Sequence, residues 1–384
     1  MKLLVVDKTA LLRNNRMRYN LLSEDCNIEL TLLTTNKWIE NTKPFLYEKS
    51  TTKENYKTIV GKVWMHGHAM LAGYYSGMIK AFYKSQPEII LLLEESFSIF
   101  ALQTIFLAKI FSPTSKIIFY NWHILSYRYF PHKLGFLYRF MGTALAGMCD
   151  VGLSHLPKSK QALDDARSGV RSLIMFQGLN NSPFTNNLIT KAEGRLKLNL
   201  TKDSIYFLYV GRLLEPKGIQ YAINAIHDLR LELNLDLRMI ILGEGDFKNE
   251  LVKLANELSI SKFINFFSSV KIEQVPLFMR SADCLILPSK STIHEQFGRV
   301  IAEAMFSGTF VIGSTSGEIP NAIGEDGFVF IADNLQDLKI KICNFIFNKG
   351  EVENIIKNAK VNSIKKYSVN SFVEKLKSLL NELI

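Results

Sequence analysis

Short apolar runs alternate with longer segments of helical periodicity along the first half of the chain. The runs predict buried strands at Leu3–Val6, Ile28–Leu33, Ile89–Leu93, Lys116–Tyr120 and Leu173–Phe176. Between them, apolar residues recur at helical spacing, which predicts helices at Met70–Lys84, Phe97–Phe111, Leu134–Ala146 and Ser159–Ala166. This alternation indicates an α/β fold with a doubly wound parallel sheet.

The second half continues the pattern with three strands that each end in a glycine- or proline-containing loop. A β-branched and aromatic run at Ile205–Val210 leads into Gly211, a run beginning at Arg238 ends in Leu-Gly-Glu-Gly245, and Cys284-Leu-Ile-Leu-Pro-Ser289 stops shortly before Glu295. In open parallel sheets, ligands bind outside the carboxyl ends of the strands. The sequence therefore predicts that these loops form one binding site.

Two carboxylates, Glu295 and Glu303, flank a Phe-Gly pair that begins a predicted helix. The first backbone N–H groups of a helix are unpaired and carry the positive end of its dipole, which suits a diphosphate. Glycine at position 298 would let the phosphate approach the backbone. The carboxylates could accept hydrogen bonds from sugar and ribose hydroxyls. The alternative is an ordinary amphipathic helix, with Val300, Ile301, Ala304 and Met305 as its core face and both acids solvated.

The loop from Gly211 to Gly218 contains two cations between a strand and a helix. A glycine-bounded loop in this position is typical of phosphate binding. Arg212 offers a planar fork and Lys217 a point charge, so together they could neutralise a departing diphosphate without a metal.

In order and spacing, these motifs resemble the retaining glycosyltransferases of family 4. The resemblance rests on Val-Gly-Arg-Leu-x-x-x-Lys-Gly, Leu-Gly-Glu-Gly, Ala-Asp-Cys-Leu-Ile-Leu-Pro-Ser, Glu-x-Phe-Gly and Glu-Ala-Met-x-x-Gly, and it is strong from about Ile205 to Gly327. It implies the GT-B fold, in which two Rossmann-like doubly wound parallel-sheet domains face a cleft. It also implies that Glu295 contacts the donor sugar, Glu303 the ribose, and Arg212 and Lys217 the diphosphate. The donor-binding residues expected from the matched motifs are Gly211, Arg212, Lys217, Gly243, Glu295, Phe297, Gly298, Arg299 and Glu303.

A length of 384 residues suits two domains. Residues 177–200 are rich in Gly, Asn and Pro and read as a linker. We expect an acceptor-binding domain at 1–185 and a nucleotide-sugar-binding domain at 186–367. By resemblance to the family, the last helix, 368–384, should pack back onto the first domain.

Composition indicates a globular cytoplasmic protein. Hydrophobic residues make up 47% and charged residues 21%, and the four cysteines lie far apart without the spacing of a zinc site or a disulfide framework. Neither a signal segment nor an uncharged run of 18 apolar residues occurs.

The positive charge is concentrated in the first half. Residues 1–190 carry 22 Lys and Arg against 13 Asp and Glu, or +9 of the net +10. Such a field attracts an anionic partner. The segment Tyr127–Phe140 interleaves aromatic and basic residues, as interfacial segments do, although a partly buried helix with a basic edge is the alternative. With the family resemblance, this predicts a peripheral position on the inner face of the cytoplasmic membrane and no nucleic-acid partner.

The acceptor side is predicted from three places in the first half. His123 follows a strand where family members carry a cleft histidine, which would make it a catalytic residue with Glu295, Arg212 and Lys217. Glu94 and Glu95 also follow a strand, and side by side they would raise one pKa if buried. The first loop, from Asp7 to Arg16, lacks the glycines usual in the family, so Lys8, Arg13 and above all Arg16 are candidate replacements for its backbone donors; the alternative is that these cations are solvated.

These observations predict a retaining hexosyltransferase. It would move a hexose or N-acetylhexosamine from a nucleoside diphosphate sugar, UDP favoured over GDP, to a hydroxyl of a cell-envelope glycan or glycolipid. No Asp-x-Asp occurs, so we expect neither a metal nor a cofactor. The alternatives are a nucleotide-sugar epimerase or phosphorylase on the same fold, or a non-catalytic sugar-nucleotide-binding scaffold.

Overall fold

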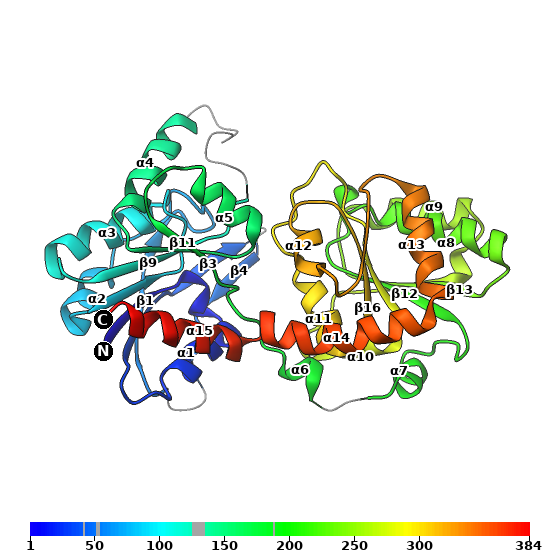
Figure 1. The fold of residues 1–384 in the computed structure, drawn as a ribbon, viewed down its shortest axis with the longest axis horizontal. Coiled ribbons are helices and arrows are strands. Elements are labelled where there is room, and N and C mark those ends of the chain that lie inside the picture. The colour runs from blue at the N-terminus through cyan, green and yellow to red at the C-terminus, as the bar shows by residue number, and fades with distance from the viewer. Residues whose placement is uncertain (41–42, 51–53, 125–134, 187–188) are drawn as a thin grey trace. The chain divides into compact units, whose positions relative to one another are not determined.

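The protein divides into two compact units in a computed structural model. The structure describes residues 1–40, 43–50, 54–124, 135–186 and 189–384. The first unit comprises residues 1–180 together with 368–384, and the second comprises residues 181–367. Both units are α/β, with the chain leaving the first unit and returning to it through the final helix (Figure 1).

The first unit is built on a seven-stranded sheet in the order β11-β10-β9-β8-β1-β2-β5, and every pair in it is parallel. Its strands are β1 (Lys2–Val6), β2 (Glu29–Thr35), β5 (Lys57–Gly61), β8 (Ile89–Leu92), β9 (Lys116–Asn121), β10 (Val151–Ser154) and β11 (Arg171–Ile174). Two small antiparallel pairs accompany the sheet, β3 (Lys37–Glu40) with β4 (Lys43–Leu46) and β6 (Val63–Trp64) with β7 (Gly73–Tyr74).

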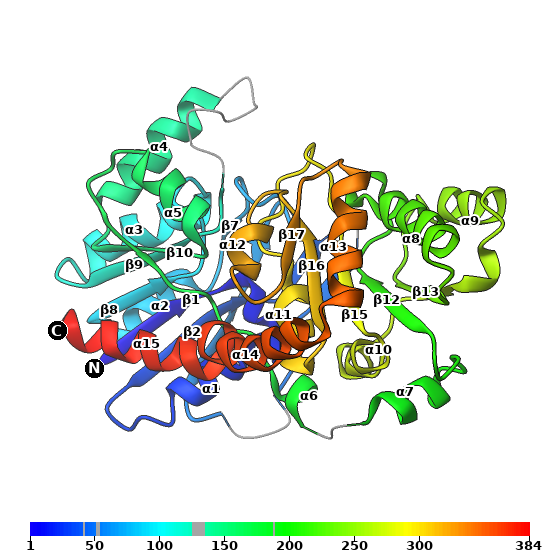
Figure 2. The ribbon, with the colours of Figure 1, turned by 45° about the vertical axis from the view of Figure 1, so that its right-hand side comes forward.

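Successive residues of a strand point to opposite faces of the sheet. Because the residues on both sides of β1 are apolar, helices cover both faces. Leu4 and Val6 of β1 pack in one core with α2 (Met78–Ser85), α3 (Ile99–Phe111), α4 (Gly135–Gly147) and Leu163 of α5 (Pro157–Asp164). Leu3 and Val5 pack in the other core with α1 (Met17–Leu22) and α15 (Val369–Glu382). The doubly wound arrangement is visible in Figure 2.

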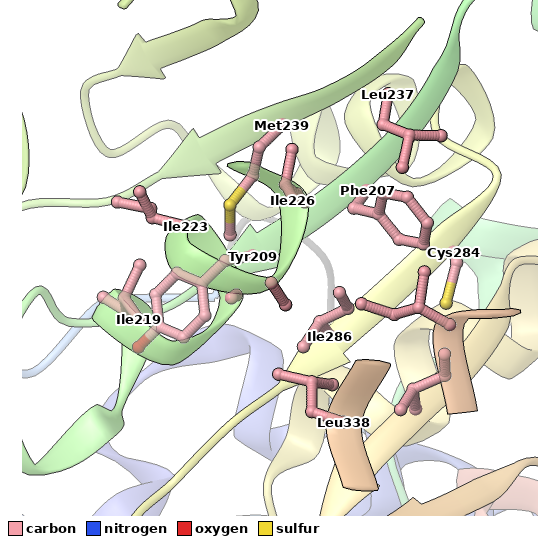
Figure 3. Close-up of a cluster of buried hydrophobic side chains, with 14 of the residues drawn as sticks. Phe207, Tyr209, Ile219, Ile223, Ile226, Leu237, Met239, Cys284, Ile286 and Leu338 are labelled. Carbon is pink, nitrogen blue, oxygen red and sulfur yellow. The ribbon is translucent and has the colours of Figure 1, made fainter. Parts of the chain in front are cut away.

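The second unit has a six-stranded sheet in the order β14-β13-β12-β15-β16-β17, again parallel throughout. Its strands are β12 (Ile205–Val210), β13 (Leu237–Leu242), β14 (Ile264–Phe267), β15 (Cys284–Leu287), β16 (Phe310–Ser314) and β17 (Phe328–Phe330). Phe207 and Ile286 are fully buried between this sheet and its helices (Figure 3). The sheet order reverses between β12 and β15, so the loops after these two strands lie at the switch point where such sheets bind ligands.

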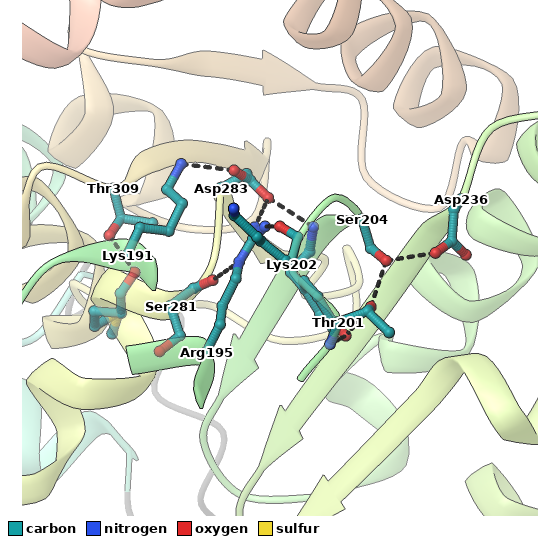
Figure 4. A network of polar contacts seen from close by, with 11 residues as sticks. Lys191, Arg195, Thr201, Lys202, Ser204, Asp236, Ser281, Asp283 and Thr309 are labelled. Carbon is teal, nitrogen blue, oxygen red and sulfur yellow. Dashed lines mark hydrogen bonds and ion pairs between the residues drawn. The ribbon is translucent and has the colours of Figure 1, made fainter. Parts of the chain in front are cut away.

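The helices of the second unit are α6 (Ser182–Thr185), α7 (Lys191–Lys197), α8 (Ile219–Leu233), α9 (Lys248–Glu257), α10 (Val275–Ser281), α11 (Arg299–Ser307), α12 (Ile319–Ile323), α13 (Leu335–Phe347) and α14 (Lys349–Tyr367). Two of them lie in the segment that reads as a linker. Arg195 of α7 is buried and donates to the Ser281 carbonyl at 3.0 Å and to Asp283 at 2.6 Å (Figure 4). The segment predicted as a linker therefore also contains a helix, α7, which Arg195 anchors to the second unit.

Every strand and helix predicted for the first half has a counterpart in the structure, with ends that differ by a few residues except at α2. That helix begins at Met78 and not near Met70, because the intervening residues form β7 and Gly77 has a φ of 94°. In the main sheet, strands β5 and β10 were not predicted, and neither were the four short strands β3, β4, β6 and β7 outside it. Within the described residues, no helix combines the length and apolar character needed to cross a bilayer.

Candidate functional site

Glycines bring the loops after β12 and β13 into close contact. A Cβ atom on Gly243 would lie 1.8 Å from the carbonyl oxygen of Gly211, so a larger residue at position 243 cannot be accommodated without moving the backbone. Gly211 in turn donates its backbone N–H to Leu242 at 3.0 Å. These two predicted donor residues thus hold neighbouring loops together at the carboxyl edge of the sheet.

The loop after β12 also contacts the loop after β15. Gly218 has a φ of 71°, and a Cβ there would lie 1.9 Å from the Pro288 carbonyl oxygen. Lys290 donates its backbone N–H to Pro216 at 3.0 Å. Lys217, between these contacts, is therefore held close to the loop that contains Glu295.

Lys217 and Glu295 form an ion pair through Lys217 Nζ and Glu295 Oε1. The same carboxylate oxygen accepts a hydrogen bond from Ser289 Oγ at 2.8 Å. Both charged side chains are largely buried, with 20% of Lys217 and 13% of Glu295 exposed. Partial burial strengthens the pair relative to a surface ion pair. Two residues predicted from separate motifs, 78 positions apart, thus meet in the folded chain.

The backbone of Glu295 is held by the loop after β16, which the sequence did not implicate. Glu318 donates its N–H to the Glu295 carbonyl at 2.8 Å. Gly317 has a φ of 54°, and a Cβ at this position would lie 2.2 Å from that carbonyl. Ser289 and Gly317 are therefore positioning residues for Glu295. Ser289 stood inside a quoted motif, but its role depends on a contact that no spacing reveals.

The helix that follows Glu295 is α11, which begins after Gly298 with a φ of 68°. No side chain caps this helix start in the described chain, so backbone N–H groups in its first turn remain suited to an anion. A Cβ on Gly298 would lie 2.9 Å from Leu287, which leaves little room for a larger residue. Phe297 is buried against Tyr367, with ring centroids 5.2 Å apart, and so fixes the entry into the helix.

Glu303 lies one turn along α11 and is buried. Burial raises the pKa of its carboxyl group, while the charge of Arg299 opposes that rise. The Arg299 guanidinium is largely exposed and lies 3.8 Å from Glu303 Oε1. A buried acid with only a distant cation is a costly arrangement, which a ligand hydroxyl could relieve by donating a hydrogen bond. Of the alternative prediction, the core face is confirmed at Ile301, Ala304 and Met305, which are buried, whereas the expected solvation of the two acids is wrong.

Arg212 is exposed at the start of the loop after β12. Its carbonyl accepts a hydrogen bond from the Tyr209 hydroxyl at 2.8 Å. Burial raises the pKa of Tyr209, Glu295 adds to the rise and Arg212 opposes it, so both charges act on the same phenol. Arg212 therefore lies in the same electrostatic neighbourhood as the Lys217–Glu295 pair.

At the carboxyl edge of the first sheet, Glu94 and Glu95 follow β8 and are both buried from solvent at their carboxyl groups. Glu94 pairs with Lys8 at 2.5 Å, and Glu95 accepts a hydrogen bond from the Trp122 backbone at 2.8 Å. Burial raises the pKa of Glu94 to about 7 and that of Glu95 to about 8. Their mutual repulsion is a minor cause for Glu95, so desolvation, and not the adjacent like charge, explains the shift.

His123 follows β9, next to β8, so it lies at the same edge as Glu95. Its ring packs edge-on against Phe97 with centroids 5.8 Å apart, and burial lowers its pKa. A neutral imidazole at the end of a strand can donate or accept a hydrogen bond without carrying charge. The structure thus collects the predicted histidine and acidic pair at one edge of the first unit.

Arg16 is fully buried and its guanidinium contacts the chain itself. It donates to the carbonyls of Ala10 at 3.0 Å and Glu48 at 2.6 Å and pairs with Glu54 at 3.0 Å. These contacts hold the first loop, which forms two short 3₁₀ turns at Lys8–Leu11 and Arg13–Arg16. The geometry accounts for Arg16 as a structural residue, and its part in acceptor binding stays a prediction.

We expect a Glu95→Gln variant to be more stable than the wild type at high pH. The folded pKa of Glu95, about 8, lies above the 4.5 of an ordinary glutamate, so its contribution to stability is intact below pH 4.5 and is lost as pH rises toward 8. The advantage of the variant at pH 8 over pH 5 should be on the order of 2–4 kcal/mol. Denaturant unfolding across this pH range measures it. The exposed Glu24→Gln change is the matched control, and an identical pH profile for Glu95→Gln and Glu24→Gln would contradict the prediction.

No group of three or more His, Cys, Asp or Glu side chains is placed to hold a metal ion in the part of the chain that the structure describes. The expected independence of metals stays a prediction.

Comparison with known structures identifies the class of fold. HepE from Anabaena, solved in complex with UDP, aligns over 100% of both chains with a TM-score of 0.72 and 16% identity. Sucrose-phosphate synthase from Thermosynechococcus elongatus aligns over 99% of this chain and 98% of its own with a TM-score of 0.71 and 16% identity. The predicted fold is confirmed: two Rossmann-like parallel-sheet domains of the GT-B type.

Residues 190–362 match the family of glycosyl transferases group 1, which confirms the predicted resemblance at the level of that family; the narrower resemblance to family 4 stays a prediction. An uncharacterized glycosyltransferase of Methanocaldococcus jannaschii is 29% identical over 51% of this chain and 50% of its own. The D-inositol 3-phosphate glycosyltransferase of Streptomyces avermitilis is 34% identical over 36% of this chain and 32% of its own. The chain thus spans half or less of the length of these curated relatives.

Proposed function

We propose that the protein is a retaining glycosyltransferase that uses a nucleoside diphosphate sugar, with UDP favoured as the nucleotide. The observation that carries the proposal is the Lys217–Glu295 pair, fixed by Ser289, beside the start of α11. This cluster combines a cation, a sugar-hydroxyl acceptor and backbone donors within one set of loops. The structural neighbour HepE has also been solved in complex with UDP-glucose, which supports the choice of donor.

In the proposed reaction the bond between the sugar anomeric carbon and the diphosphate oxygen breaks while a bond to the acceptor oxygen forms on the same face. The acceptor hydroxyl gives its proton to the departing diphosphate. Lys217 and Arg212 stabilise the negative charge that grows on that group, and Glu295 holds the sugar hydroxyls. Glu303 accepts from the ribose. His123, on the first unit, is proposed to act toward the donor sugar.

The proposed acceptor is a hydroxyl of a cell-envelope glycan or glycolipid. It is supported by the positive charge of residues 1–190 and by Glu94, Glu95 and His123 at one edge of the first sheet. The same charge supports a peripheral position on the inner face of the cytoplasmic membrane. Of the predicted interfacial segment, residues 127–134 lie outside the described residues, and 135–140 form the start of α4.

A donor panel tests the proposal. A ligand present at 100 times its dissociation constant should stabilise the protein by about 2.7 kcal/mol, so a thermal-shift comparison of UDP, GDP and their sugars identifies the donor. That donor is then incubated with and without candidate acceptors. Transfer requires the acceptor, epimerisation proceeds without it, and a scaffold consumes nothing. Failure of every nucleotide sugar to bind would overturn the proposal, and the anomeric configuration of the product, read by NMR, tests retention.

A further inference from the structure

Three neighbouring helices of the first unit expose pairs of large apolar side chains one turn apart. The pairs are Ile79 and Tyr83 of α2, Phe106 and Ile110 of α3, and Phe136 and Phe140 of α4; we call this surface the α2–α4 face. Each of the six is between 55% and 77% exposed. Residues four apart lie on the same side of a helix. Each helix therefore presents an apolar stripe outward.

The three stripes belong to one surface because the helices lie in one layer. Their inner sides share a single hydrophobic core on one face of the first sheet. α3 packs against both α2 and α4, and the three helices can be followed in Figure 1. The rings of Phe82 in α2 and Phe111 in α3 lie 6.4 Å apart. Soluble monomers rarely expose contiguous apolar patches larger than a few hundred Å² unless a partner covers them.

The three helices of the α2–α4 face carry charge of one sign, and beside Phe136 and Phe140 the neighbouring segment adds one acid and one base, Asp165 and Arg167. The exposed cations Lys80, Lys84, Lys109 and Arg139 stand on these helices, and none of the three helix sequences contains Asp or Glu. Long basic side chains beside apolar ones suit a lipid surface, where the stems stay in contact with acyl chains and the charges reach the phosphates. The chemistry of the face is complementary to an anionic bilayer.

A second copy of the chain is a poorer occupant for the same reason. In a two-fold symmetric contact the same surface meets itself, which would bring the cations of one face against those of the other. Like charges placed opposite one another in an interface oppose association. α3 has 13 residues and spans about 20 Å, less than the roughly 30 Å of a hydrocarbon core, so this helix can lie on a bilayer but cannot cross one.

We propose that the α2–α4 face docks the protein onto the anionic surface of a lipid bilayer, with Phe106, Ile110, Phe136 and Phe140 entering the interface. This deepens the proposed membrane association by assigning it to described helices, α3 above all, which lies outside the segment Tyr127–Phe140 predicted to be interfacial. The docking does not depend on which sugar is transferred, or on whether transfer occurs.

The test is co-sedimentation of the full chain with vesicles of phosphatidylcholine alone and with vesicles in which phosphatidylglycerol replaces a third of it. The wild type should bind the anionic vesicles preferentially, and the binding should weaken as salt rises. The Phe106→Ser/Ile110→Ser double variant should lose roughly tenfold or more in partition coefficient, as expected for two fewer inserted apolar side chains. The Lys84→Gln/Lys109→Gln/Arg139→Gln variant should lose its preference for anionic lipid.

Matched controls keep these outcomes specific. Leu231→Ser/Phe347→Ser removes two exposed apolar side chains from helices of the second unit and should bind as the wild type does. Circular dichroism and donor binding check that each variant is folded. Equal binding by wild type and the Phe106→Ser/Ile110→Ser variant, or equal binding of the wild type to both vesicle types, would overturn the proposal. So would a dimer in sedimentation velocity that the same double variant abolishes, since it would assign the face to a second copy.

Discussion

The Lys217→Gln variant should lose roughly a hundredfold to a thousandfold in kcat while remaining folded, as is usual when a contact to charge developing in the transition state is removed. Glutamine removes the positive charge and keeps an N–H donor directed toward Glu295, although its side chain is one bond shorter than that of lysine. Turnover of donor at saturation measures the effect.

The choice of glutamine separates two roles of Lys217. If the side chain serves only to hold Glu295, the amide should preserve most of the activity. If it neutralises the departing diphosphate, the charge is essential and activity falls. Lys253→Gln is the control, because Lys253 is a highly exposed lysine on α9 of the same unit. Near wild-type kcat in a folded Lys217→Gln protein would remove Lys217 from the catalytic residues.

The second large effect concerns the different proposed roles of Glu303, which would bind the ribose, and Glu295, which would bind the donor sugar. We expect Glu303→Ala to weaken binding of free UDP by about 1–3 kcal/mol, because an unmet ribose hydroxyl would be left in a buried place. Glu295→Gln should bind free UDP at least as well as the wild type, since Lys217 loses its ionic partner and is available to the diphosphate. Its turnover of the sugar donor should nevertheless fall.

Isothermal titration calorimetry with free nucleotide decides between these roles. Glu303→Gln is the matched variant that keeps side-chain volume, and it distinguishes loss of the acceptor charge from a cavity left by alanine. Equal losses of UDP affinity in the Glu295 and Glu303 variants would contradict the assignment of one acid to the sugar and the other to the ribose.

Most of the fold could be predicted because its strands are buried on both faces and read as continuous apolar runs. Strand β12 is such a run, Ile-Tyr-Phe-Leu-Tyr-Val, and so is β8. Strand β10 was missed because Val151-Gly-Leu-Ser contains only two large apolar residues. The start of α2 was placed too early because its periodicity extends across Gly73 and Gly77, where backbone geometry overrides side-chain pattern.

The candidate site could be predicted as a set of residues but not as a set of contacts. Motif order located Lys217 and Glu295, yet their direct pairing brings together loops 78 positions apart. Arg16 shows a second limit of prediction from sequence. A cation in a loop at the sheet edge is typical of ligand binding, but the guanidinium of Arg16 donates its hydrogen bonds to carbonyl groups of the chain itself. Spacing along the chain cannot distinguish a guanidinium that faces a ligand from one that holds its own loop.

The return of α15 to the first unit has a consequence for the order in which the protein folds during synthesis. Phe372, Leu376 and Leu380 of this helix complete the core beneath β1 and α1, although residues 1–180 are synthesised long before them. The second unit, by contrast, is one continuous stretch of chain from Asn181 to Tyr367. During synthesis, one face of the first sheet therefore lacks α15 until the whole second unit has been synthesised. Chaperones that recognise exposed apolar surface would meet the chain at that stage.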